Sequence, residues 1–210
     1  MEVKRVVLAT ANEGKIREIK MMLADLPLSI MTVKDFPEFP GVEEDGEDFF
    51  ANAYKKARAV AEFTSLPAIA DDSGLVVPAL GGWPGVKSAR FAGERATDGE
   101  NIEKLLELMK DLPEGERKAY FTCVVVYCEP AGKYESFTGK WEGLIIREER
   151  GKGGFGYDPI FFVPALGRTA AELAPEEKNK YSHRGQALKA LKEHLSKSLK
   201  FVESGRSAAW

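Results

Sequence analysis

Residues 3–23 read VKRVVLATANEGKIREIKMML, and this stretch decides the fold. Its first seven residues are rich in β-branched apolar side chains and predict a buried strand. The polar turn TANEGK follows at residues 10–15, and apolar residues then recur at helical spacing, as Ile16, Ile19 and Leu23. A strand, a glycine turn and a helix in this order are typical of the start of an α/β protein.

The rest of the chain continues with one strand and one helix and then turns mostly to strands. Strands are predicted at residues 28–33, 68–70 with a continuation at 75–77 beyond a bend, 120–127, 133–138, 144–146 and 159–163, and helices at 50–63, 101–109 and 187–195. This order favours an α/β fold with a mixed β-sheet flanked by helices. Trp83, Trp141 and the valine-rich strand 120–127 are predicted to lie in the core. Residues 1–200 are expected to form a single domain, with residues 201–210 as a frayed tail.

Composition excludes several classes of protein. The chain has 210 residues, 44% of them hydrophobic, and a formal charge of −3, as in an ordinary globular protein. No stretch approaches the roughly 20 apolar residues of a membrane span, and the apolar run 6–9 is too short for a secretory signal. The acidic balance argues against binding a nucleic-acid backbone by bulk charge. We therefore expect neither a membrane nor a nucleic-acid partner.

The cysteines and histidines are few. Cys123 and Cys128 are five residues apart on a predicted strand, so their side chains point to opposite faces of it. The two residues lie about 16 Å apart along the strand and cannot form a disulfide with each other. A reducing cytoplasm is the expected location. His194 is predicted to lie on a solvated helix face, and the sequence offers no Ser-His-Asp or Cys-His arrangement.

The polar turn at residues 10–15 lies between the first strand and helix. Backbone N–H groups at a helix start attract phosphate, and a lysine there adds a full positive charge. The turn is not a Walker A loop, because it lacks that spacing and has no Ser or Thr after Lys15. An ordinary turn capped by Thr10 or Asn12 explains the same residues. The candidate phosphate-binding residues are Thr10, Ala11, Asn12, Glu13, Gly14 and Lys15.

Two adjacent carboxylates, Asp71 and Asp72, follow the apolar strand at residues 68–70. Adjacent carboxylates repel each other unless a cation lies between them, and Mg²⁺ prefers oxygen ligands. They also follow a buried strand, where an open α/β sheet binds its ligands. A solvated turn is the alternative, because Asp, Ser and Gly are common in turns. The stretch EEDG at 43–46, inside the acidic loop 36–48, offers a third carboxylate, although alone it is typical of a solvated loop.

The glycine-rich stretch GKGGFGYDP at residues 151–159 is a candidate binding loop. Glycines let a backbone approach a ligand closely, and Phe155 has little bulk beside it in sequence to pack on. Its ring is therefore a candidate for stacking on a flat base. A hairpin turn whose aromatic side chains fold inward is the alternative.

The basic stretch KNKYSHRG at residues 178–185 precedes the last predicted helix. Lys178 and Lys180 are candidates for contacting phosphate, and His183 and Arg184 for donating to a base carbonyl. Taken alone, the stretch is better explained as a solvated basic turn.

Taken together and in order, five motifs resemble those of the inosine triphosphate pyrophosphatase family, the house-cleaning hydrolases of ITP, dITP and XTP. The resemblance covers about residues 3–195, with Ala11 where many members have glycine. It implies an elongated mixed sheet, two lobes with a central cleft, a homodimer and Mg²⁺ dependence. The implied reaction converts a nucleoside triphosphate and water to the monophosphate and pyrophosphate. The motifs that carry it lie at residues 10–15, 43–46, 70–75, 154–159 and 182–185.

The resemblance also implies roles by matched position. Residues 10–15 would bind the triphosphate, Glu43 and Asp72 would hold the metal, and Asp72 would also accept a proton, supported by Asp71. A donor such as Arg184 would pair with the C6 carbonyl of hypoxanthine or xanthine and would disfavour adenine, which has an amino group there. The other implied substrate contacts are Ser73, Phe155, Gly156, Tyr157, Asp158, Lys178 and His183.

Two alternatives stay open at this point. One is a pyrophosphatase of related fold that acts on dTTP and UTP, against which the loop of Phe155 and the pair His183 and Arg184 favour a purine. The other is a non-catalytic nucleotide-binding protein on the same scaffold. Such a protein could lose its metal carboxylates, whereas Glu43, Asp71 and Asp72 are all present.

Overall fold

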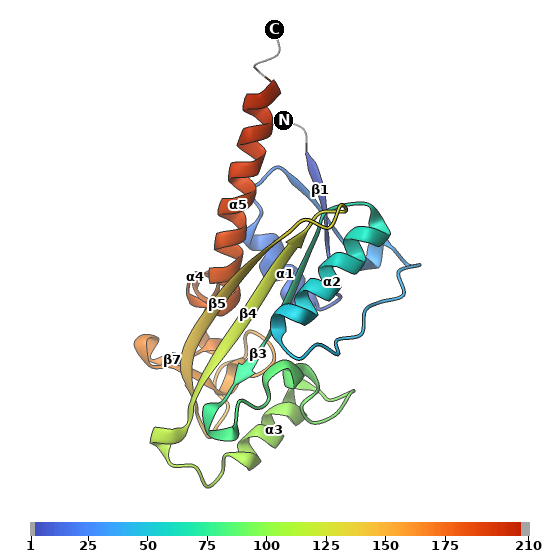
Figure 1. Ribbon diagram of the computed structural model, residues 1–210. Coiled ribbons are helices and arrows are strands. Elements are labelled where there is room, and N and C mark those ends of the chain that lie inside the picture. The colour runs from blue at the N-terminus through green and yellow to red at the C-terminus, as the bar shows by residue number, and fades with distance from the viewer. Residues whose placement is uncertain (1–2, 207–210) are drawn as a thin grey trace.

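The computed structural model describes residues 3–206, with side-chain surroundings through residue 199, and forms one seven-stranded sheet flanked by helices (Figure 1). The strands lie in the order β2-β1-β3-β4-β5-β6-β7. β1 pairs in parallel with β2 and β3, and the other neighbours are antiparallel, so the predicted mixed sheet is confirmed.

The strands are β1 Lys4–Leu8, β2 Leu28–Thr32, β3 Ala68–Val76, β4 Lys118–Cys128, β5 Tyr134–Ile145, β6 Phe161–Val163 and β7 Arg168–Thr169. The α-helices are α1 Glu13–Met22, α2 Phe49–Thr64, α3 Asp98–Leu108, α4 Pro175–Tyr181 and α5 His183–Arg206. The 3-10 helices are η1 Val33–Asp35, η2 Pro78–Leu80, η3 Gly85–Arg90, η4 Glu114–Glu116, η5 Asp158–Ile160, η6 Pro164–Leu166 and η7 Ala170–Glu172.

Both faces of the central strands are buried, and alternate residues of β4 enter different cores. Cys123 and Val125 pack in a cluster with α1 and α5, whereas Val126 and Cys128 pack in a second cluster with α2. This alternation follows from the pleat of a strand, and it confirms that the two cysteines lie on opposite faces. A third cluster, which includes Trp141, joins α3 to β5 and β6 at the other end of the sheet.

The polar stretch after residue 70 is not a turn. β3 continues without a bend from Ala68 to Val76, and Asp71 and Asp72 pair with Val125 and Val124 of β4. The backbone ladder to β4 keeps these residues extended, although Asp, Ser and Gly disfavour strands. Because successive strand residues face opposite ways, the two carboxylates point to opposite sides of the sheet.

Other predictions are corrected locally. The strands predicted at 133–138 and 144–146 are parts of the single strand β5, and Pro159 belongs to η5 rather than to a strand. Trp83 is 48% exposed, because it lies in a tight turn after two glycines with positive φ. His194 is half-buried, with its ring centroid 5.7 Å from that of Phe137.

The ends of the chain add two facts. The backbone of α5 is helical through Arg206, and residues 207–210 of the predicted tail lie outside the described residues. Among the helices of residues 3–206, none combines the length and apolar character needed to cross a membrane.

Candidate functional site

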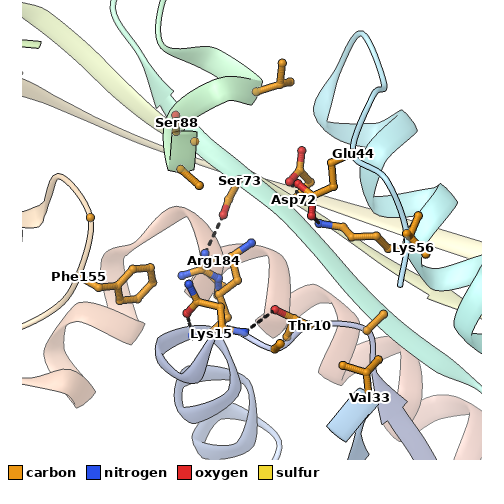
Figure 2. Close-up of a pocket in the computed structure, with 18 of the residues that line it drawn as sticks. Thr10, Lys15, Val33, Glu44, Lys56, Asp72, Ser73, Ser88, Phe155 and Arg184 are labelled. Carbon is orange, nitrogen blue, oxygen red and sulfur yellow. Dashed lines mark hydrogen bonds and ion pairs between the residues drawn. The ribbon is translucent and has the colours of Figure 1, made fainter. Parts of the chain in front are cut away.

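A cavity of about 590 Å³ lies over the middle of β3, within the size range of small-molecule sites. Its walls come from the loops that follow β1 and β2, from β3 and η3, from the loop before η5, and from α4 and the start of α5 (Figure 2). Glu13, Gly14, Glu43 and Asp71 do not line it. The predicted site residues that do line it are Thr10, Ala11, Asn12, Lys15, Asp72, Ser73, Phe155, Gly156, Tyr157, Asp158, Lys178, His183 and Arg184.

The loop after β1 is a capped helix start that opens into this cavity. Asn12 is the N-cap of α1, and its Oδ1 accepts a hydrogen bond from the backbone N–H of Lys15 at 3.0 Å. The Thr10 hydroxyl oxygen accepts from the N–H of Asn12 at 3.2 Å. Glu13 instead forms an ion pair with Lys34 at the surface. The loop therefore offers a helix N-terminus with one lysine, which suits an anion.

Asp71 is fully buried on the α1–α5 side of β3. Its Oδ2 lies 3.1 Å from Lys15 Nζ and 3.1 Å from Arg184 Nε, and it accepts from the Ser73 hydroxyl at 3.3 Å. Burial raises the pKa of Asp71, but Lys15 and Arg184 outweigh burial and hold that pKa well below its usual range. Asp71 is therefore an ionised anchor for two cations rather than a group in the cavity wall.

Asp72 faces the cavity on the other side of β3. Its Oδ1 lies 3.3 Å from Lys56 Nζ, and its Oδ2 accepts from the side-chain amide of Asn52 at 3.2 Å. Burial raises the pKa of Asp72, and Lys56 offsets only part of that rise. A carboxylate whose pKa is raised is a stronger base, which suits a proton acceptor.

Lys56 also bridges Asp72 to the acidic loop, because its Nζ lies 2.8 Å from Glu44 Oε1 (Figure 2). Glu43 is exposed and does not line the cavity, so the structure does not bring it beside Asp72 as predicted. Exposure alternates from residue 41 to residue 46, and Glu44 is one of the less exposed residues and lines the cavity. The sequence reasoning missed Lys56, although a lysine on the face of α2 that also carries Ala53 is a visible signal.

The carboxylates of Glu44 and Asp72 fit a divalent ion. Both are oxygen donors that converge on one cationic group, the ammonium of Lys56. Mg²⁺ is commonly held by one or two carboxylates together with substrate phosphates. Across residues 3–206, no three His, Cys, Asp or Glu side chains gather closely enough to hold a metal ion alone. The donor set therefore fits an ion that arrives with a phosphate ligand.

At the other end of the cavity, Phe155 is held by its own loop. The Asp158 carboxylate accepts from the N–H of Phe155 at 2.9 Å and from Lys178 Nζ at 2.6 Å. Lys178 lies 4.7 Å from the centre of the Phe155 ring, and Arg184 lies 5.4 Å from it. Burial raises the pKa of Asp158, and Lys178 opposes that rise. The exposed Lys180 lies over Tyr181 and does not line the cavity, so its predicted phosphate contact is not supported.

Glu18 connects α1 to Lys178 of α4 and Arg184 of α5. Its carboxylate accepts from Lys178 at 3.0 Å and from an Nη atom of Arg184 at 2.5 Å. The other Nη of Arg184 donates to the Ser73 hydroxyl at 2.7 Å. Lys178 is therefore held between Glu18 and Asp158, and its charge is already neutralised. Sequence reasoning missed Glu18, whose partners are about 160 residues away along the chain.

His183 lies in the cavity wall, with its ring stacked on Phe121 at 4.8 Å between centroids. Its Nδ1 has no hydrogen-bond partner among the described residues. Burial, reinforced by Arg184 and Lys178, keeps the pKa of His183 well below its ordinary value. The ring is therefore neutral at pH 7, with one donor and one acceptor nitrogen.

The loop of Phe155 is tied to its surroundings by two further hydrogen bonds. The N–H of Gly156 donates to Asp98 at the start of α3 at 2.7 Å, and the hydroxyl of Tyr157 donates to the carbonyl of Ser88 at 2.9 Å. The ring of Phe155 also packs against Gly14, where an added Cβ would lie 2.7 Å from a ring carbon. The loop is therefore preorganised beside the helix start of α1.

Known proteins resemble this chain over most of its length. A model of the Ham1 family matches residues 6–194. The dITP/XTP pyrophosphatase of Geobacter sulfurreducens is 54% identical over 191 residues, which cover 91% of this chain and 96% of that protein. The dITP/XTP pyrophosphatase of Escherichia coli K12 is 54% identical over 194 residues, covering 91% and 98%.

Solved structures agree with these sequence matches. A HAM1 protein from Coxiella burnetii superposes with a TM-score of 0.85 at 47% identity, covering 92% of this chain and 99% of that one. The Ham1 protein of Staphylococcus aureus superposes with a TM-score of 0.83 at 41% identity, covering 93% and 100%. The resemblance inferred from the five motifs is thus confirmed, and this chain belongs to the Ham1 family.

Proposed function

We propose that this chain hydrolyses non-canonical purine nucleoside triphosphates (ITP, dITP and XTP) to the monophosphate and pyrophosphate, with Mg²⁺ as cofactor. The observation that carries the proposal is one cavity with an aromatic ring at one end, a carboxylate pair at the other and a helix N-terminus beside them. Relatives about 54% identical are named dITP/XTP pyrophosphatases.

Glu44 and Asp72 would hold Mg²⁺, with Glu44 in place of the Glu43 that the motif first suggested. A bound divalent ion polarises phosphoryl oxygens and neutralises the charge that develops on them. Asp72 accepts the proton of the attacking water, and burial favours this role by raising the pKa of its carboxyl group. The water oxygen bonds to the α-phosphorus, the bond from that phosphorus to the bridging oxygen breaks, and pyrophosphate leaves.

The chain's own residues position the substrate. The N–H groups at the start of α1 and the ammonium of Lys15 bind phosphate oxygens, while the ring of Phe155 stacks on the base. In the structure Lys15 is paired with Asp71, so it shares its charge between that carboxylate and the phosphates. Asp71 acts through Lys15 and Arg184 and is a positioning residue.

Arg184 supports selection of the base. Its guanidinium has five N–H groups, and three are used by Asp71, Glu18 and Ser73. A remaining donor pairs with the C6 carbonyl of hypoxanthine or xanthine. Adenine presents an amino group at that position, and a buried donor left unpaired costs about 1–3 kcal/mol. This argument disfavours ATP.

The two lobes, the homodimer and the cytoplasmic location implied by the family resemblance remain predictions. The names of the relatives favour a purine substrate over the pyrimidines of the related dTTP and UTP hydrolases. Size-exclusion chromatography with light scattering tests the homodimer, because a monomeric mass at micromolar concentration would contradict it.

The activity is tested with purified protein, Mg²⁺ and a panel of ITP, XTP, dITP, GTP, ATP, UTP and dTTP. Pyrophosphate and orthophosphate are quantified separately. We expect pyrophosphate from the first three substrates, and Asp72→Asn should lose turnover while still binding ITP. Preference for a pyrimidine, or release of orthophosphate, would contradict the proposal. Tight binding without turnover by the unmodified protein would favour the non-catalytic alternative.

A further inference from the structure

Within the acidic loop, residues 41–46 carry three adjacent acids and form no regular secondary structure. Glu43 and Asp45 face outward and Glu44 faces the cavity. Because exposure alternates from residue 41 to residue 46, a shift of one residue would exchange the inner position of Glu44 with the outer position of Glu43 or Asp45. The register of the loop therefore decides which carboxylate lies beside Asp72.

Arg90, the last residue of η3, holds the loop from one side. One of its Nη atoms donates to the backbone carbonyl of Glu44 at 2.7 Å. Arg90 lies 46 residues away along the chain, and it is only partly exposed. A bond to the backbone of Glu44 fixes the position of the residue without using its carboxylate, which pairs with Lys56.

Asn52 of α2 holds the loop from the other side. It is 1% exposed, and its Oδ1 accepts from the N–H of Gly46 at 2.8 Å. An N–H group is a donor, so the amide oxygen must face Gly46 and the amide nitrogen must face Asp72. That nitrogen donates to Asp72 Oδ2 at 3.2 Å. One buried amide therefore connects the loop directly to the carboxylate that Glu44 has to meet.

We propose that Arg90 and Asn52 are positioning residues that fix the register of the acidic loop, so that Glu44 rather than Glu43 or Asp45 completes the divalent-cation site with Asp72. Neither residue lines the cavity. The inference rests on the metal role in the proposed function. Partners outside the ligand set that orient metal ligands typically contribute 10–100-fold to metal affinity.

The primary measurement is Mn²⁺ binding to the protein saturated with an ITP analogue in which a methylene group replaces the oxygen between the α- and β-phosphates, followed by electron paramagnetic resonance, which needs no turnover. We expect Arg90→Met and Asn52→Ala to weaken Mn²⁺ binding about 10–100-fold. The Mg²⁺ concentration that half-activates ITP hydrolysis should rise in parallel, while Arg90→Met recovers most of its kcat at saturating Mg²⁺. Arg58→Met is the matched control, because this exposed arginine of α2 pairs, among the residues that the structure describes, only with Glu62 and Tyr54.

A second comparison separates a loss of register from a general loss of stability. In the unmodified protein, Glu43→Gln should leave Mn²⁺ binding unchanged because Glu43 faces solvent. In the Arg90→Met background the loop can shift and bring Glu43 inward, so Glu43→Gln should weaken binding further. If Glu43→Gln changes the Mn²⁺ affinity by the same factor in both backgrounds, the register argument is contradicted.

The outcomes distinguish this inference from the proposed function. Folded Arg90→Met and Asn52→Ala variants with unchanged Mn²⁺ affinity and Mg²⁺ dependence would overturn the positioning role while leaving the activity intact. An unmodified protein that binds Mn²⁺ but hydrolyses no triphosphate would overturn the proposed function, and the Mn²⁺ titrations would still test the loop. An unmodified protein that neither binds Mn²⁺ nor hydrolyses triphosphates would overturn both.

Discussion

Asp71 and Asp72 are adjacent in sequence, yet their replacement by asparagine should affect different properties. Asp71→Asn should lower the stability of the fold, whereas Asp72→Asn should mainly abolish turnover. Asp71 is fully buried between the cations of Lys15 and Arg184. In Asp71→Asn both cations lose a charged partner, and removing one member of a buried ion pair costs about 3–5 kcal/mol. Arg184 keeps its bond to Glu18, which limits the loss, so we expect a value near the lower end of that range.

Asp72→Asn should cost much less stability. The pKa of Asp72 is raised mainly by burial, which means that folding disfavours its ionised form. Lys56 retains Glu44 and the backbone carbonyl of Asp71 as partners after the substitution. We therefore expect a change within about 1 kcal/mol together with loss of turnover, because the proton acceptor is gone.

Urea unfolding followed by circular dichroism measures the contrast. With slopes of about 2–3 kcal/mol per molar urea, Asp71→Asn should lower the midpoint by roughly 1–2 M and Asp72→Asn by less than about 0.5 M. Equal midpoints for the two variants, or a larger loss for Asp72→Asn, would refute the assignment of Asp71 as anchor and Asp72 as the cavity carboxylate.

The pH dependence supplies an independent check on Asp71. Its pKa is lowered in the folded protein, so its contribution to stability is fully present above the unfolded pKa of about 3.9 and is lost as pH falls toward the folded pKa. The difference in unfolding free energy between the unmodified protein and Asp71→Asn should therefore be constant from pH 7 to about 5 and shrink below about pH 4. A difference that grows on acidification would contradict the charge state assigned to Asp71.

Three further predictions follow from the cavity. Glu44→Gln should raise the Mg²⁺ concentration needed for half-maximal activity about 10-fold or more, whereas Glu43→Gln should leave it unchanged in the same titration. Gly14→Ala places a methyl group 2.7 Å from a carbon of the Phe155 ring, so KM for ITP should rise, and in a Phe155→Ala background the methyl should have little added effect. Removing divalent cations with EDTA should weaken ITP binding far more than IMP binding by isothermal titration calorimetry, and equal losses would contradict a metal–triphosphate contact.

Much of the fold follows from local pattern. In the opening strand and helix, apolar residues recur at the spacing typical of each element. β4 contains a continuous run of mostly β-branched and aromatic residues. The continuity of β3 does not follow from local pattern, because Asp71, Asp72 and Ser73 are poor strand formers. Pairing with β4, whose matching residues lie about 50 positions later, holds them extended. Local propensity indicates a turn here, and the long-range ladder overrides it.

The candidate site divides in the same way. Residues that act through a short motif, such as Asn12 as helix cap and Asp72 beside the cavity, are visible in the sequence. Residues that act through distant partners are not, and Glu18 and Asn52 belong to this class. That Glu44 rather than Glu43 lines the cavity is also invisible in sequence, because the position of a loop residue depends on distant contacts, such as the hydrogen bond that Arg90 donates to the Glu44 carbonyl.

The balance of charge around the cavity explains why a divalent ion is needed although four largely buried cations surround the site. Those cations are paired with five carboxylates in the cavity wall or directly behind it, so this network carries no positive excess when all its members are ionised. A triphosphate brings about four negative charges, and few compensating charges are free to meet them. Side chains alone would have to give up buried partners at a cost of several kcal/mol each. An ion that arrives with the phosphates adds positive charge without breaking those pairs. The cations are Lys15, Lys56, Lys178 and Arg184, and the carboxylates are Glu18, Glu44, Asp71, Asp72 and Asp158.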